Sequence, residues 1–123
     1  MHAAVHGRPL DQDVYAADGG DLVYVRDCGR AIALLQLADR LSYRTYNVSA
    51  GRVTTNAELA AAIGEVIPGA RLDLRDGRGP GWLGRDIYLD ISRLREDTGF
   101  RPGYGTAAGV ADYVGWLRSG NDR

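Results

Sequence analysis

Apolar residues recur at steps of three and four along two long segments of the chain, a pattern that predicts amphipathic helices. The first segment covers residues 27–39, and its apolar stripe consists of Cys28, Ala31, Ile32, Leu35 and Ala38. The second covers residues 55–67, and its stripe consists of Leu59, Ile63, Val66 and Ile67. Each stripe occupies one side of its helix, so we expect both helices to bury that side against a core.

Residues at the ends of these two segments supply start and stop signals. Asp27 stands at the start of the first helix, where its carboxylate complements the positive helix terminus. Thr55 and Glu58 form a capping box at the start of the second helix. Pro68-Gly69 then ends that helix.

The same criteria predict three further helices. A short opening helix ends at Gly7. Another begins after Asp90 and ends at Gly99, where Phe100 supplies the hydrophobic contact of a Schellman ending. The last helix covers residues 106–120, and its apolar face consists of Val110, Tyr113, Val114 and Leu117.

Short extended segments lie between the helices. Residues 13–16 and 22–25 predict two strands that are joined by the polar turn Asp18-Gly19-Gly20. Residues 71–75 alternate polar and apolar side chains, as a half-buried strand does, and residues 87–89 form another short extended piece.

The strand predicted over residues 45–48 has no neighbour in the sequence with which it could form a hairpin. A sheet of two or three strands is marginal alone, so this strand needs a sheet that other residues build. The predicted fold class is therefore a helix-rich α/β chain with few short strands.

The length of 123 residues fits one domain, which we expect to span residues 1–123. The hydrophobic fraction of 45% and the charged fraction of 25% are ordinary for a globular protein. The longest apolar run falls far short of the roughly 18 residues of a membrane span, and the N-terminus lacks a signal-peptide pattern. Cys28 is the only cysteine and is expected in the core. We expect no membrane association and a cytoplasmic location.

The charge pattern excludes several functions. A net charge of −1 argues against a nucleic-acid-binding module, which carries a positive excess. All 15 basic residues are Arg, and the chain contains no Lys. Without Lys there is no Schiff base, no P-loop and no Tyr-x-x-x-Lys pair for proton transfer.

Two sequence features have the form of ligand sites but favour a simpler interpretation. Residues 79–84 satisfy G-x-G-x-x-G, yet a strand-like segment follows instead of a helix, so we interpret them as a surface loop. Trp82 within this loop either covers a ligand or lies exposed. His2 and His6 lack a third metal ligand nearby, so we expect no metal there.

Three short segments of the sequence follow one another in a characteristic order. They are Leu22-Val23-Tyr24-Val25-Arg26-Asp27, Tyr46-Asn47-Val48-Ser49-Ala50-Gly51, and Leu89-Asp90-Ile91-Ser92-Arg93 followed by Gly99-Phe100-Arg101-Pro102. Together they resemble the C-terminal, substrate-binding part of the extended short-chain dehydrogenase/reductases, the NAD-dependent epimerase/dehydratase family. The resemblance covers nearly the whole chain. It implies that the N-terminal Rossmann half is absent and that the fold is incomplete without its dinucleotide-binding sheet.

The resemblance also implies substrate-binding residues, namely Arg78, Arg85, Tyr15, Gly20 and Asp21. Arg78 occupies the position from which an arginine of the family grips the substrate's diphosphate, and Arg85 is the second choice. Gly20 stands where the family has another phosphate-binding Arg, which indicates a smaller or differently charged ligand than a standard nucleotide sugar. Tyr15 and Asp21 would face the same pocket. The alternatives are a solvated loop for Arg78 and simple packing for Tyr15.

Members of this family are nucleotide-sugar isomerases and other oxidoreductases. From the resemblance we expect this chain to bind a polar or phosphorylated small-molecule substrate, to hold no cofactor and to be inactive alone. NAD or NADP would enter only if a Rossmann half completed the fold. Two alternatives stay open: a subunit of a split enzyme completed in trans by a Rossmann partner, and a stand-alone self-association or interaction domain that forms homo-oligomers.

Overall fold

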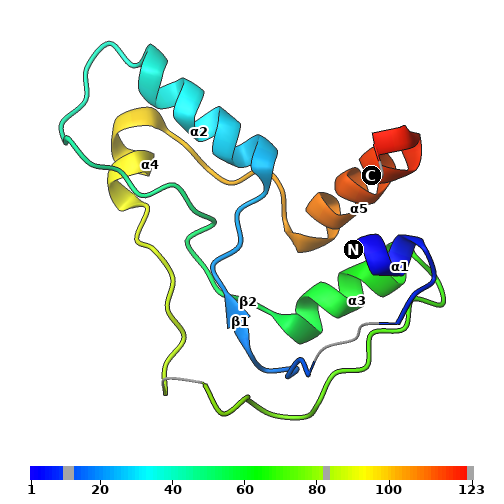
Figure 1. Cartoon of the computed structure of the whole chain (residues 1–123). Helices are drawn as coiled ribbons and strands as arrows, with labels where there is room; N and C mark the ends of the chain where they lie inside the picture. Colours follow the sequence, from blue (N-terminus) through cyan, green and yellow to red (C-terminus); the bar gives the residue numbers. More distant parts are fainter. Residues whose placement is uncertain (10–12, 82–83, 122–123) are drawn as a thin grey trace. The chain divides into compact units, whose positions relative to one another are not determined.

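Helices account for most of the regular structure in the computed structural model, which describes residues 1–9, 13–81 and 84–121 (Figure 1). The elements are α1 (His2–Val5), β1 (Gly19–Gly20), α2 (Val25–Leu37), β2 (Thr54–Thr55), α3 (Asn56–Val66), α4 (Ser92–Thr98), α5 (Thr106–Trp116) and a final kinked turn, η1 (Leu117–Asn121), in which Ser119 and Gly120 leave the helical conformation. β1 and β2 pair in a two-stranded sheet. The prediction of a helix-rich α/β chain with few short strands is confirmed.

The chain divides into two compact units. Unit 1 comprises Met1–Gly19, Thr54–Arg85 and Gly105–Arg123, and unit 2 comprises Gly20–Val53 and Asp86–Tyr104. The expectation of a single domain over residues 1–123 stays a prediction, because this division describes compactness and not independent folding.

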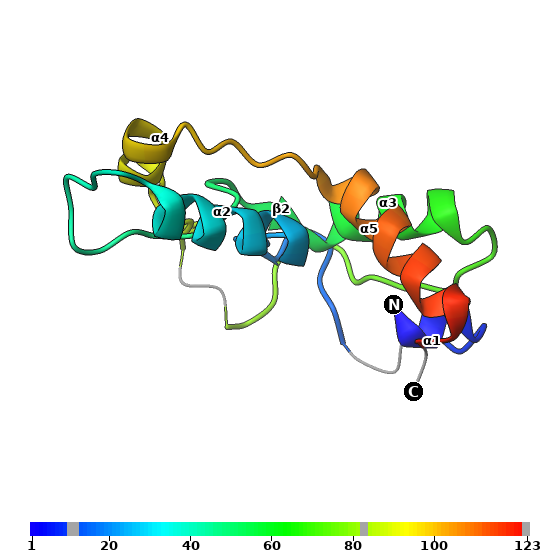
Figure 2. The same cartoon turned by 90° about the horizontal axis from the view of Figure 1, so that it is seen from above.

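Unit 1 is organised around α3 and α5, which pack side by side (Figure 2). Their buried core consists of Ala4, Ala62, Ile63, Ile67, Val110 and Val114. The predicted start of α3 is confirmed, because the Thr55 hydroxyl accepts the Glu58 N–H at 3.1 Å. The Glu58 carboxylate also accepts the Thr106 hydroxyl at 2.8 Å, which ties the first turns of α3 and α5 together.

The hairpin predicted from residues 13–16 and 22–25 is wrong. Tyr15 forms a parallel bridge with Arg75 instead: the Arg75 N–H donates to the Val14 carbonyl and the Ala16 N–H to the Arg75 carbonyl, each at 2.8 Å. The predicted turn at Gly19–Gly20 becomes strand β1. Alternation of side chains shows which side of a segment is buried, but it does not choose the segment with which it pairs.

Unit 2 is organised around α2 and α4, whose buried core consists of Ala31, Ile91, Leu94 and Phe100. α2 begins two residues before its predicted start. Ile32, predicted in its buried stripe, is 50% exposed. Ala31 and Leu35 of the predicted stripe do lie in or against this core, and Leu34, which the stripe did not include, packs against it as well.

Two predicted strands of unit 2 do not form. Among the described residues, neither 45–48 nor 87–89 belongs to a strand, because no described segment pairs with them. Residues 45–48 nevertheless keep a strand's alternation: Thr45 and Asn47 are exposed, whereas Tyr46 and Val48 pack against the core.

The C-terminal end of α4 follows the prediction, whereas its N-cap residue is Ile91 and not Asp90. The Asp90 carboxylate accepts the Ser92 N–H at 2.8 Å and the Ser92 hydroxyl at 2.6 Å. Gly99 ends the helix with φ +67°, and Phe100 beyond it is fully buried.

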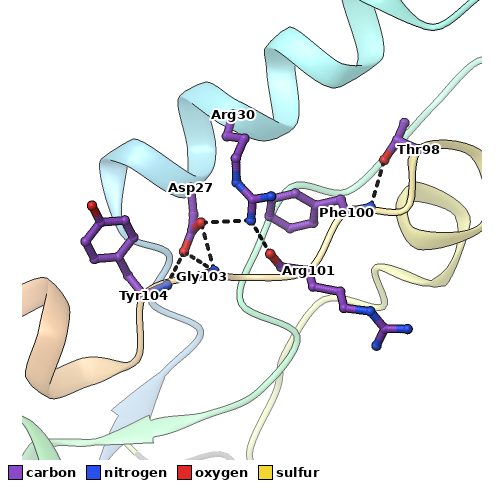
Figure 3. A network of polar contacts seen from close by, with 7 residues as sticks. All are labelled: Asp27, Arg30, Thr98, Phe100, Arg101, Gly103 and Tyr104. Atoms are coloured by element: carbon purple, nitrogen blue, oxygen red, sulfur yellow. Dashed lines mark hydrogen bonds and ion pairs between the residues drawn. The ribbon is translucent and has the colours of Figure 1, made fainter.

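Asp27 carries the main polar network of unit 2 (Figure 3). Its side chain is 2% exposed, and its carboxylate accepts the Gly103 N–H at 2.9 Å and the Tyr104 N–H at 2.8 Å. Arg30 lies 3.3 Å from the same carboxylate and donates to the Arg101 carbonyl. One buried carboxylate thus fastens the start of α2 to the segment after Phe100.

The protonation of Asp27 follows from these contacts. Burial raises its pKa, whereas the N–H groups of Gly103 and Tyr104 and the charge of Arg30 lower it. The lowering contributions prevail, so the pKa of Asp27 in the folded chain lies below its ordinary value of 3.8.

We expect Asp27→Asn to lower the free energy of unfolding by about 2 kcal/mol at neutral pH, because two backbone N–H groups lose a charged acceptor. In the unmodified chain this contribution is complete above the ordinary pKa and is lost as the pH falls through the lower folded pKa. Urea unfolding from neutral to strongly acidic pH measures both effects. The exposed Asp39 supplies the control, and an equal loss in Asp39→Asn would contradict the assignment.

Two glycines of unit 2 give opposite predictions. Gly29 lies exposed inside α2 with open space where a Cβ would stand, so Gly29→Ala should raise the free energy of unfolding by about 0.5–1 kcal/mol. Gly99 has φ +67°, so Gly99→Ala should lower it by about 1 kcal/mol. Urea unfolding of both variants is the measurement. Changes of the same sign would refute the helix geometry.

Candidate functional site

The loop that carries Arg78 is docked onto unit 1 at two points. The Ala17 N–H donates to the Gly77 carbonyl at 2.9 Å. The Gly79 N–H lies 3.2 Å from each oxygen of the Asp18 carboxylate. Arg78, which lies between these two anchors, is half-buried. Its backbone is therefore held in place before any ligand arrives.

Gly79 fits this position because it lacks a side chain. A Cβ there would lie 2.8 Å from an oxygen of Asp18 and 3.0 Å from the ring of Tyr15, distances that real Cβ atoms essentially never show. The loop can thus approach Asp18 and Tyr15 closely only with glycine at this position. The glycine-rich composition of the loop has a packing reason here.

Tyr15 is fixed from several directions. Its carbonyl accepts the side-chain amide of Asn56 at 2.9 Å, and its backbone pairs with Arg75. The Arg75 guanidinium lies 5.9 Å from the centre of the Tyr15 ring and 2.6 Å from the Asp13 carboxylate. A hydrogen bond with Tyr15 and the charge of Asp13 raise the pKa of Arg75 above its ordinary value.

Asp21 lies in unit 2 and already has several protein partners. Its carboxylate accepts the Ser49 hydroxyl, the Ala50 N–H at 3.2 Å and the Leu89 N–H at 2.8 Å. These bonds hold the segment after residue 48 and the segment before α4 together. The contribution of Ser49, which is 2% exposed, had no signal in the sequence beyond its place in the second of the three short segments.

The predicted substrate-binding residues are thus divided between the units. Unit 1 contains Tyr15, Arg78 and the exposed Arg85, whereas Gly20 and Asp21 belong to unit 2. A Cβ at Gly20 would meet no atom within 4 Å, so no steric reason requires glycine there. The substrate-binding role of all five residues stays a prediction.

Asp18 and Asn56 are positioning residues that the sequence reasoning did not single out. Asp18 appeared only as part of a turn, and its contact with Gly79 spans 61 residues. Such a long-range contact leaves no local pattern to find. An Asp followed by two glycines was the only hint.

The remaining candidate groups have these surroundings. The ring nitrogen Nε2 of His2 lies 3.2 Å from the Tyr113 hydroxyl, and Cys28 is half-buried on α2. In the described part of the chain, no group of three His, Cys, Asp or Glu side chains could hold a metal ion. No helix of these residues is long and apolar enough to cross a bilayer.

The G-x-G-x-x-G segment, residues 79–84, was interpreted from the sequence as a surface loop. Trp82, and with it the choice between covering a ligand and lying exposed, falls outside the described residues. Beyond the segment the next helix is α4, which begins only at Ser92. A dinucleotide fingerprint needs a helix directly after its glycines, so the loop interpretation is favoured.

Comparison with solved structures gives matches over almost the whole chain. The GalE-like L-threonine dehydrogenase from Cupriavidus necator is 34% identical over 94% of this chain and 43% of its own length, with a TM-score of 0.74. UDP-N-acetylglucosamine 4-epimerase from Bacillus cereus is 22% identical over 94% of this chain and 40% of its own, with a TM-score of 0.75.

A third match is the Bordetella bronchiseptica enzyme WbmF, solved in complex with NAD+ and UDP. It is 20% identical over 96% of this chain and 34% of its own length, with a TM-score of 0.73. The chain therefore spans less than half the length of each of these three enzymes. No protein-family model matches the chain, and a search of curated proteins finds no match either.

We expect Asp18→Ala to release the loop at Gly79, because the Gly79 N–H loses its charged acceptor. Hydrogen exchange of the Gly79 amide should become about tenfold faster, because the amide loses one hydrogen bond to a charged group. Asp73→Ala, at an exposed aspartate of unit 1, is the matched control and should leave that amide unchanged. Equal exchange in the two variants would show that Asp18 does not hold the loop.

Proposed function

Because the chain has the fold of the C-terminal portion of NAD-dependent epimerase- and dehydratase-type short-chain dehydrogenase/reductases, we propose that it is the substrate-binding portion of such an oxidoreductase. A shared fold does not by itself specify the reaction, so the proposal depends on the residues of the site. The substrate class that these residues favour is a polar, phosphorylated small molecule.

The observation that carries this proposal is the anchored Arg78 loop. Its neighbours Gly77 and Gly79 are both fixed to unit 1, so an anion would meet a guanidinium whose backbone is already ordered. Preorganisation of this kind reduces the entropic cost of binding. A planar guanidinium suits a phosphate because it can donate two parallel hydrogen bonds.

In this proposal the chain performs no redox chemistry alone. With no Lys anywhere in the sequence, it cannot supply a Tyr-x-x-x-Lys pair. We assign cofactor binding, with NAD or NADP, to the part of the fold that the structural neighbours contain beyond this chain. The neighbour WbmF was solved with NAD+ and UDP, which makes UDP a reasonable probe of the substrate side.

A second candidate function is that of one subunit of a split enzyme, completed in trans by a Rossmann partner. It is favoured by residues 45–48, which have a strand's alternation and no strand partner in the described structure. The reaction type, isomerisation or oxidation, and the substrate would then be set jointly by both subunits.

We expect Arg78→Ala to weaken UDP binding by about tenfold or more, because a charge-assisted hydrogen bond is worth roughly 1.5–3 kcal/mol. Isothermal titration calorimetry of the full chain at low salt is the measurement. The UDP affinity of Arg78→Lys should lie between those of the unmodified chain and Arg78→Ala, because lysine keeps the charge but lacks the planar guanidinium group. Arg71→Ala, at an exposed arginine of the same unit, is the control and should leave UDP binding unchanged. Arg85→Ala tests the second candidate for the anion-binding arginine.

Two results would overturn the proposal. If Arg78→Ala and Arg71→Ala bind UDP equally well, the loop is not an anion site. If the isolated chain binds NAD+ or turns over a substrate with it, the assignment of all cofactor chemistry to other residues is wrong.

A further inference from the structure

A second arginine, Arg75, lies next to the loop that carries Arg78. Its backbone pairs with residues 14–16 of the same unit: the Arg75 N–H donates to the Val14 carbonyl and the Ala16 N–H to the Arg75 carbonyl, each at 2.8 Å. Two main-chain hydrogen bonds thus fix the point from which the Arg75 side chain extends. Three residues of extended chain span at most about 11 Å, so the two arginine side chains start close together.

The ring of Tyr15 contacts both Arg75 and the Arg78 loop. Tyr15 and Arg75 are paired in a parallel bridge, and the guanidinium carbon of Arg75 lies 5.9 Å from the centre of the ring. The loop touches the same ring, because a Cβ at Gly79 would lie 3.0 Å from its Cδ2 atom. The Arg75 guanidinium and the Arg78 loop therefore adjoin one rigid side chain.

Asp13 holds this guanidinium in an ion pair at the surface. The Asp13 carboxylate lies 2.6 Å from a nitrogen of Arg75, and the two side chains are 70% and 57% exposed. An ion pair between such exposed side chains contributes little to stability, so another anion can replace the carboxylate. Asp18 differs, because its carboxylate accepts the Gly79 N–H and holds the loop. Of the two carboxylates, Asp13 is therefore the one that a ligand can displace.

A phosphate competes well with a carboxylate for an arginine. A terminal phosphate carries about −1.5 to −2 charges at neutral pH, more than a carboxylate does, and it offers two oxygens to the planar guanidinium. We propose that Arg75 is a second anion-binding residue beside Arg78, and that Asp13 occupies it until the second phosphate of a diphosphate ligand displaces the carboxylate. A monophosphate held by Arg78 leaves the ion pair in place. Asp13 and Arg75 thus select diphosphates over monophosphates.

This inference rests on the proposed function, in which Arg78 binds an anion, and adds two residues that determine specificity. The resemblance of sequence places the family's second phosphate-binding arginine at Gly20, which has no side chain and belongs to unit 2. Arg75 supplies a second positive charge within unit 1 itself. The sequence did not single out Arg75 or Asp13, because their contact spans 62 positions.

The test measures UDP and UMP binding to the full chain by isothermal titration calorimetry at low salt. Arg75→Gln should weaken UDP binding about tenfold and UMP binding less than about twofold, because only the diphosphate engages Arg75. Asp13→Asn should strengthen UDP binding roughly threefold or more, because the ligand no longer displaces a carboxylate. Asp73→Asn is the matched control. It removes an exposed aspartate two residues from Arg75 and should leave both affinities unchanged.

The double variant Asp13→Asn/Arg75→Gln separates displacement from a general effect of charge. If Asp13 acts by occupying Arg75, its substitution should have no effect on UDP binding once Arg75 is replaced. Hydrogen exchange of the Ala16 amide tests for a merely structural role, because this amide donates to the main-chain carbonyl of residue 75. Its rate should be unchanged in every variant. Faster exchange in Arg75→Gln would show a structural role instead and overturn the inference.

Two binding results would also overturn it: equal effects of Arg75→Gln on UDP and UMP, or equal effects of Asp13→Asn with and without Arg75. The roles of the two arginines can fail separately. If Arg78→Ala weakens UDP binding and Arg75→Gln does not, only the role of Arg75 is rejected. If the Arg75 and Asp13 variants behave as expected and Arg78→Ala has no effect, only the role of Arg78 is rejected. Absence of UDP binding to the unmodified chain would reject both.

Discussion

The buried carboxylate of Asp27 is the constraint on which unit 2 depends. A charge that is 2% exposed is stable only when hydrogen bonds replace water, and here the N–H groups of Gly103 and Tyr104 and the guanidinium of Arg30 do so. These bonds join the first turn of α2 to the segment after Phe100. Ala31, one turn further along the helix, is fully buried in the core of unit 2, whereas Ile32 is 50% exposed.

Unit 1 uses the same chemistry at Asp18. Its carboxylate accepts a backbone N–H from a loop far away in the sequence, as Asp27 does, and thereby orders the segment around Arg78. Each unit thus relies on a carboxylate that binds backbone N–H groups of a distant, irregular segment. Such segments have no helix or sheet ladder of their own, so a side chain must supply their acceptors. This second carboxylate and the hydrogen bond from the Ala17 N–H to the Gly77 carbonyl together hold the loop that carries Arg78.

The two units differ in the side chains that they expose. Among its described residues, unit 1 exposes one large hydrophobic side chain, Trp116, and it contains Arg78, for which we propose a substrate-binding role. Among the described residues, unit 2 contains nine of the ten exposed large hydrophobic side chains and the strand-like segment 45–48. The predicted substrate-binding residues are divided between the units, because Tyr15, Arg78 and Arg85 belong to unit 1 whereas Gly20 and Asp21 belong to unit 2.

The sequence by itself determined the helices, their caps and the resemblance of fold, because these depend on residues close together in the chain. Thr55 and Glu58, or Gly99 and Phe100, act within a few residues, so their roles can be read locally. Only the tertiary structure decided the pairing of Tyr15 with Arg75, the contact of Asp27 with Gly103 and the docking of Gly79 on Asp18. Each of these joins residues 60 or more positions apart. The energy of such a contact depends on which segments meet in space, and local periodicity carries no information about that choice.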